Sequence, residues 1–222
     1  MERRICLAVL GAFVIACNAA DDPVAPSVSA SELNDEGIAP AAVPIFTGQA
    51  TVLDASVLSI ISRVSDAGPI LKPPGGRFEF RFPFASLPDL ASARDLDCIT
   101  VGAGNRAIAE ASANDVRLTI GDHDITIDRV NAMISAACVA EGPPQSRGLA
   151  VVRSLFVDGE RVEVLDILNQ RIELPTGFIV INEQSSFATP FHAGGTVKAL
   201  RIVIDRGVRT ADIAIARVQA HV

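Results

Sequence analysis

The sequence predicts an all-β protein: an antiparallel β-sandwich of about ten strands after a disordered tether, with an open β-barrel as the alternative. Three observations lead to this fold class. The 222-residue chain is 49% apolar, which is enough for a core. From Ile45 onward it consists of short apolar runs separated by Gly, Pro and Asp turns. Several turns are flanked by alternating apolar and polar residues, as in half-buried strands.

The first 17 residues predict export and lipid anchoring. The charged residues Glu2-Arg3-Arg4 precede an apolar run that is too short to span a bilayer but typical of a signal peptide. The run ends in Val14-Ile15-Ala16-Cys17, which resembles the lipobox of bacterial lipoproteins. This resemblance implies that residues 1–16 are removed and that Cys17 carries the lipid. The alternative is an ordinary signal peptide with a cysteine near its cleavage site.

Two or three acyl chains would hold the protein stably on a membrane without spanning it. Asn18 follows the cysteine, where Asp would favour retention at an inner membrane. We therefore expect an exported protein whose membrane partner is reached through the N-terminal lipid, at the outer membrane or cell surface.

Residues 17–44 predict a disordered acidic tether. They contain Pro23, Pro26, Pro40 and Pro44, several acidic residues and no basic one, and they have no helical or alternating period. Residues 45–222 then form a single all-β domain. The net charge of −7 argues against a nucleic-acid partner, and the absence of Trp and Tyr argues against a sugar-binding platform.

The strands are expected in the following order. The early strand candidates are residues 47–53, 57–64, 77–82 and 98–102, and residues 87–94 are expected to form a short helix. A hairpin over residues 107–138 turns at residues 121–124 and places Ile120 opposite Ile125. Its inward-facing positions shift by one residue on both arms, near Val116 and Arg129, which predicts a bend.

Three further hairpins complete the predicted domain. One turns at Asp158-Gly159, a dipeptide typical of tight hairpin turns. Another turns at Leu174-Pro175-Thr176-Gly177, and the last joins residues 199–204 to 212–218.

The part of the chain after residue 109 resembles the bacterial choice-of-anchor P family. The matching segments are Ala111-Ser112-Ala113, Ile125-Thr126-Ile127-Asp128, Val157-Asp158-Gly159, Ile181-Asn182-Glu183-Gln184 and Asp212-Ile213-Ala214. The resemblance implies an exported, envelope-anchored β domain whose type of anchor varies between members. It implies no biochemical activity.

The four cysteines have separate expected fates. Cys6 leaves with the signal peptide and Cys17 carries the lipid, so Cys98 and Cys138 remain. An even pair in an exported chain predicts a disulfide between them. The alternative is a pair of buried free thiols.

Few residues suggest chemistry, and we expect no catalytic residue, no metal and no cofactor. The run Asp122-His123-Asp124 is better explained as a hairpin turn than as a metal site. Asn182, Glu183 and Gln184 are weak polar-site candidates. In one interpretation Glu183 is a general acid or ligand group. In the favoured one, Asn182 and Gln184 bond to the backbone and Glu183 pairs with an arginine, so that the three form a structural clasp.

These expectations together predict a non-catalytic structural, adhesive or assembly module of the cell envelope. Its partner would be an unidentified envelope protein or polymer. The alternative is a module that binds small ligands or carbohydrates, and an envelope hydrolase is a weaker third interpretation because no catalytic motif is present.

The anchoring prediction can be tested with Cys17→Ser. Loss of the acylated thiol should move the protein from the detergent-extracted membrane fraction into the soluble fraction, because no lipid then holds it. Fractionation and palmitate labelling measure this. Unchanged partitioning, together with an unlabelled wild type, would contradict lipid attachment.

Overall fold

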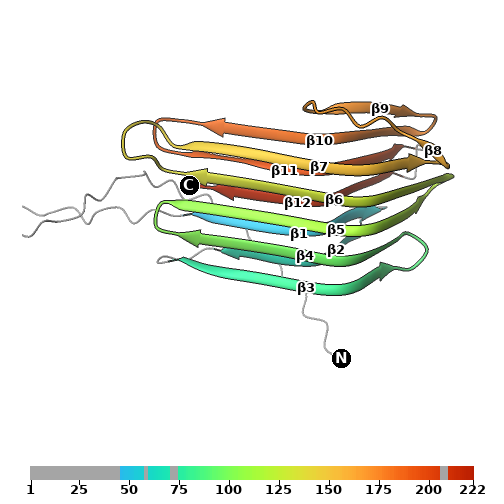
Figure 1. Ribbon diagram of the computed structural model, residues 1–222, viewed down its shortest axis with the longest axis horizontal. Helices are drawn as coiled ribbons and strands as arrows, with labels where there is room; N and C mark the ends of the chain where they lie inside the picture. The colour runs from blue at the N-terminus through green and yellow to red at the C-terminus, as the bar shows by residue number, and fades with distance from the viewer. Residues whose placement is uncertain (1–45, 58–59, 71–74, 206–209) are drawn as a thin grey trace, which may run out of the picture.

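The computed structural model contains two six-stranded antiparallel sheets stacked one behind the other (Figure 1). It describes residues 46–57, 60–70, 75–205 and 210–222. The predicted signal peptide, Cys17 and the tether therefore lie outside the described residues. Within the described ranges, no helix is long and apolar enough to cross a membrane.

Sheet A has the strand order β2-β1-β12-β11-β10-β9 and sheet B the order β3-β4-β5-β6-β7-β8. Sheet A consists of β1 (Thr47–Val57), β2 (Ile60–Ile70), β9 (Gln170–Leu174), β10 (Gly177–Ala188), β11 (Ala193–Asp205) and β12 (Thr210–His221). Sheet B consists of β3 (Gly75–Leu87), β4 (Ala91–Ala103), β5 (Arg106–Ile120), β6 (His123–Ala137), β7 (Gln145–Val157) and β8 (Glu160–Arg161).

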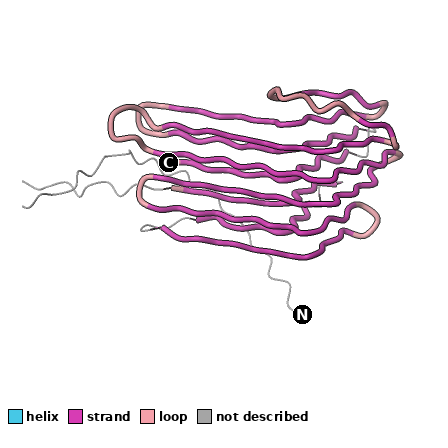
Figure 2. The backbone as a smooth tube through the Cα atoms, in the orientation of Figure 1, coloured by secondary structure: helices cyan, strands magenta, loops and turns pink. Residues whose placement is uncertain are grey.

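Consecutive strands are neighbours except where the chain crosses between sheets, from β2 to β3 and from β8 to β9. The last strand, β12, returns to pair with β1 in the middle of sheet A. The described strands do not close into a barrel, so the sandwich prediction is confirmed. The described residues contain twelve strands where about ten were expected, and their loops lie at the two ends of the sheets (Figure 2).

The central hairpin β5–β6 is present, but its predicted register is wrong by two residues. Ile120 lies opposite His123 and Leu118 opposite Ile125. The turn contains only Gly121 and Asp122, with Gly121 at a φ of 65°. Two-residue turns of this kind match the twist of antiparallel strands. A shift of two residues keeps every side chain on its predicted face, so the predicted inward positions remain correct.

The segment expected to be a helix, residues 87–94, contains no helix: Leu87 ends β3, residues 88–90 form a turn, and residues 91–94 begin β4. The amide of Leu90 donates to the carbonyl of Leu87 at 3.1 Å. Pro88 fixes its own φ, and Asp89 has a left-handed φ of 57°. These two residues reverse the chain and leave no room for a helical turn.

The bend predicted on β5 and β6 is part of a row that crosses both sheets. Asp115 on β5 has a φ of 46°, and two consecutive residues there do not alternate between the two faces. Register places Asp115 beside Asp128 on β6, where the inward positions also change from odd to even numbers. Six residues along this line have a left-handed φ, and we call them the left-handed row: Ser65, Asp95, Asp115, Ser154, Asn182 and Ala216. Most are Ser, Asp or Asn, and Asp and Asn tolerate this conformation better than most residue types.

The row has a consequence for the outer face of sheet A. On β1, Val52 and Leu53 are both buried, so Thr51 and Asp54 flank two consecutive inward residues. On β11, Lys198 and Arg201 likewise flank the buried Ala199 and Leu200. Neighbouring strands repeat this arrangement, which gathers polar side chains along one line.

The core between the sheets is built from small and aliphatic side chains. The inward positions of the first half of β5 are Ala107, Ala109, Ala111 and Ala113, all buried, and the second half continues with larger aliphatic residues. They face a sheet whose inward residues include the buried alanines 193, 199, 216 and 220. The sheets approach closely: a Cβ added to Gly48 on β1 would lie 2.6 Å from Cγ2 of Thr100 on β4. This spacing leaves little room for large aromatic rings.

The left-handed row predicts that valine destabilises the protein more at Asp115 than at the neighbouring Asp128. Asp115→Val should lower the free energy of unfolding by about 1–2 kcal/mol, because a β-branched residue is strained at this φ. Asp115→Gly should be tolerated. Asp128→Val is the matched control: the residue is exposed on the adjacent strand but is not left-handed. Denaturant unfolding measures all three, and equal losses for the two valine variants would contradict the explanation.

Candidate functional site

The most distinctive surface feature is a row of phenylalanines on β3. Phe78, Phe80 and Phe82 are 42–47% exposed, and we call these three the aromatic edge. Phe84 on the same strand is 57% exposed, but it pairs with the exposed Arg94 and lies on the other face. β3 is the outermost strand of sheet B and lies at the lower border of the molecule in Figure 1. No described strand pairs with its free side.

The aromatic edge lies on the inner side of sheet B. Phe78, Phe80 and Phe82 are paired across the ladder with Thr100, Cys98 and Leu96. Directly opposed residues share a face, and these three partners are buried in the core. The phenylalanines therefore point toward the side occupied by sheet A, although they remain partly in solvent.

They are exposed because sheet A ends one strand earlier. Ser65 on β2 is hydrogen-bonded to Cys98 on β4, with 3.1 Å between Oγ and Sγ. The hydroxyl of Thr100 on β4 donates to the carbonyl of Ala67 on β2 at 2.8 Å. These bonds place β2 over β4, and β2 also contacts β3, so that sheet A covers β3 only in part.

The positions of the other described phenylalanines show that the core holds few aromatic rings. Phe46 is the only phenylalanine among the buried residues of the described chain. Phe187 and Phe191 are also exposed, but they belong to the end of β10 and the loop that follows it. The closely packed, alanine-rich core leaves little room for rings, and four of them are gathered on one edge strand.

The other face of β3 carries alternating charges. Arg77 and Arg81 each contact Glu79, with N–O distances of 2.5 Å, and Arg81 also reaches Asp97 at 3.2 Å. The hydrogen bond from Arg77 lowers the pKa of Glu79, so this carboxylate stays ionised at neutral pH. The strand thus presents an apolar face and a charged face along one free edge.

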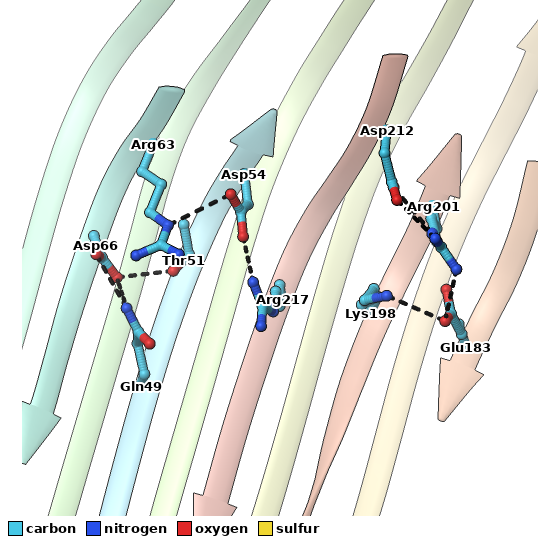
Figure 3. Close-up of polar contacts among 10 residues, drawn as sticks. All are labelled: Gln49, Thr51, Asp54, Arg63, Asp66, Glu183, Lys198, Arg201, Asp212 and Arg217. Carbon is cyan, nitrogen blue, oxygen red and sulfur yellow. Dashed lines mark hydrogen bonds and ion pairs between the residues drawn. The ribbon is translucent and has the colours of Figure 1, made fainter. Parts of the chain in front are cut away.

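A second feature is a charged network on the outer face of sheet A (Figure 3). Asp54 accepts hydrogen bonds from Arg63 and Arg217, and Glu183 accepts from Lys198 and Arg201. Figure 3 shows these residues side by side across β2, β1, β12, β11 and β10. They lie along the line where the left-handed row places polar side chains next to one another.

This network also encloses a shallow hollow of about 330 Å³. Arg201 donates to both oxygens of Asp212, which lowers the pKa of that carboxyl and raises the pKa of the guanidinium. Gln49 and Thr51 donate to Asp66. The acids and bases therefore pair mainly with each other, which makes the network a stabilising surface rather than a strongly charged binding site.

Asn182, Glu183 and Gln184 lie within β10. The side-chain amide of Asn182 donates to the carbonyl of Ile167 at 3.2 Å, and that of Gln184 donates to Asn182 at 2.6 Å. Glu183 pairs with Lys198 and Arg201, as noted above. These contacts are those expected of a clasp, except that the Gln184 side chain bonds to a side chain instead of the backbone.

His123 lies buried where the ends of the two sheets meet. Its Nδ1 is 2.8 Å from a carboxylate oxygen of Asp158, and its Nε2 is 3.0 Å from the hydroxyl of Thr176. The bond to His123, with one from the Asp124 amide, lowers the pKa of Asp158. His123 therefore ties β6 to the turns β7–β8 and β9–β10. Among the described residues, no three side chains are grouped to hold a metal.

The predicted disulfide between Cys98 and Cys138 is wrong. Cys98 is a free, buried thiol bonded to Ser65, and burial raises its pKa. Cys138 follows the far end of β6, where its amide donates to Asn105. Cys98 lies six residues before Gly104 along β4, or about 20 Å from that end of the sheet at the usual rise per residue. The two cysteines therefore cannot be bridged.

No family model, curated protein or solved structure matches this chain.

The aromatic edge was missed by the sequence analysis although its signal was visible. The predicted strand at residues 77–82 contains the alternation, and Phe recurs at every second position through residue 84. By itself that alternation is typical of an ordinary strand with one face in the core. Only the ending of sheet A at β2 turns the same residues into a surface.

The correction at Cys98 gives a prediction about thiol reactivity. Cys98 should resist iodoacetamide in the folded protein, because its thiol is buried and its raised pKa disfavours the reactive thiolate. It should react fully once the chain is unfolded in urea without reductant. Mass mapping of the peptide that contains Cys98 measures this, and a requirement for reductant would instead indicate a disulfide.

Proposed function

We propose that this protein is an envelope-anchored, non-catalytic assembly module. Lipid on Cys17 would hold it to a membrane, and the β-sandwich would bind another protein of the envelope. The lipobox-like segment and the resemblance to choice-of-anchor P proteins support the location. The observation that carries the assembly role is the aromatic edge.

Exposing an apolar row of this kind to water costs free energy, and contacts with a partner would remove that cost. At 42–47% exposure, the three Phe side chains of the aromatic edge leave about 250 Å² of their surface in water. Contiguous apolar patches of a few hundred Å² on soluble proteins are often functional.

The backbone of β3 offers a second binding element. An edge strand presents unpaired N–H and C=O groups, which can add a strand from another chain. Natural edge strands are commonly protected by charges or proline, and β3 carries Arg77, Glu79, Arg81 and Pro83. The charges lie on the face opposite the aromatic edge, so the face with Phe78, Phe80 and Phe82 stays open.

The proposal is tested by the double variant Phe78→Ser/Phe82→Ser in the full chain. Cross-linking in intact cells should capture an envelope protein, which includes a second copy, with the wild type. The variant should reduce that product about tenfold or more, because buried aromatic anchors dominate interfaces. Phe191→Ser is the matched control, since this ring is similarly exposed in a loop away from β3.

Melting curves of both variants would establish that they are folded. Equal cross-linking in the wild type and the double variant would contradict the proposed role of the aromatic edge.

A further inference from the structure

We propose that the partner at the aromatic edge is a second copy of this chain, joined by antiparallel pairing of β3 with β3 about a two-fold axis at Phe80. This inference rests on the assembly function proposed above and names its partner. Sheet B would thereby continue from one copy into the next.

Symmetry restricts the ways in which two β3 strands can pair. An antiparallel edge-to-edge pair is related by a two-fold axis perpendicular to the sheet. This axis keeps the aromatic face of both copies on the same side, so phenylalanine must lie opposite phenylalanine and charge opposite charge. With the axis at Phe80, Phe78 faces Phe82 of the second copy and Phe80 faces its own equivalent.

The charges on the other face favour this register over its neighbours. With the axis at Phe80, Glu79 of each copy lies opposite Arg81 of the other. Moving the axis to Glu79 would place Glu79 opposite Glu79 and Arg77 opposite Arg81. Moving it to Arg81 would place Arg81 opposite Arg81. Directly opposed like charges destabilise a sheet, and opposite charges stabilise it.

The shape of the edge also suits a second copy. Because β2 lies over β4, each copy contributes one partly covered strand, and the two strands would form the floor of an apolar trough between the two β2 edges. The rings of each copy would then cover those of the other. Pro83 would lie opposite Arg77, near the end of the paired segment, where its missing donor interrupts the fewest bonds.

The available area indicates an interface of modest size. The three rings of each copy would bury about 500 Å² from the two copies together, and the paired backbones and the charged side chains would add to it. Stable interfaces bury about 1,200–2,000 Å². The pairing is therefore expected at the lower end of this range.

Disulfide trapping tests the axis. In the full chain expressed in bacterial cells, Phe80→Cys should give a covalent dimer on a non-reducing gel, because the two introduced thiols face each other across the axis. Cys98→Ala is included throughout, since Cys98 lies opposite Phe80 within the same chain and its thiol would compete for the introduced one.

Ser86→Cys is the matched control on the same exposed strand. In this register position 86 of one copy would be about 40 Å from position 86 of the other, so no covalent dimer should form. Absence of a Phe80→Cys dimer, or equal trapping by both variants, would overturn the inference.

Charge exchange tests the register. In the Phe80→Cys background, Glu79→Arg alone sets the introduced arginine opposite Arg81 of the other copy. Arg81→Glu alone sets the introduced glutamate opposite Glu79 of the other copy. Each should lower trapping several-fold, because like charges then oppose each other. Co-expression of the two variants with tags of different size should restore a mixed dimer, because each arginine then meets a glutamate. Failure of the mixture to recover would contradict the stated register.

The same variants separate this inference from the proposed function. If Phe80→Cys gives no dimer while Phe78→Ser/Phe82→Ser still removes an envelope cross-link, the second copy is wrong and the assembly function stands. If Phe80→Cys gives no dimer and the serine variant keeps its envelope cross-link, both the second copy and the assembly function are wrong. If the serine variant instead loses binding to vesicles of phosphatidylethanolamine and phosphatidylglycerol, with no dimer trapped, lipid occupies the edge and the inference is overturned.

Discussion

The close approach of the two sheets is the constraint on which the rest of the structure depends. Alanines line the inner face of the first half of β5 and recur on the facing strands, and a Cβ on Gly48 would already clash with Thr100. Interiors pack as densely as organic crystals, so a core of this thickness has little space for aromatic rings. The core is instead aliphatic, with Ile, Leu and Val filling the positions between the alanines.

The left-handed row connects this core to the outer face of sheet A. Where two consecutive residues point inward, the flanking polar side chains come together outside, and Asp54, Glu183, Lys198 and Arg217 form their network there. The same backbone feature therefore completes the core and builds a self-neutralised surface. A clasp at Asn182 extends this arrangement toward the β8–β9 connection.

The aromatic edge follows from the same packing and from the way sheet A ends. Ser65 and Thr100 fix β2 over β4, which leaves β3 only partly covered on its inner side. The thin core has little room for aromatic rings, and several of them are held on a free edge instead. The alternating charges beside them complement those of a second β3 strand in only some registers. The proposed pairing of two copies would bury the apolar face, supply hydrogen bonds to the free backbone groups and pair the opposite charges.

The sequence by itself determined the β class, most hairpins and the inward face of the central hairpin, because alternation and turn residues act over neighbouring positions. It also located the bend near Val116 and Arg129, since both arms change phase there. The two-residue error in register was invisible to that pattern, because such a shift preserves the faces. The partner of Cys98, the pairing of Glu183 with Lys198 and Arg201, and the exposure of the aromatic edge depend on how strands far apart in the chain are stacked. Only the tertiary structure decided these, because local periodicity places a side chain on a face but does not say whether another sheet covers it.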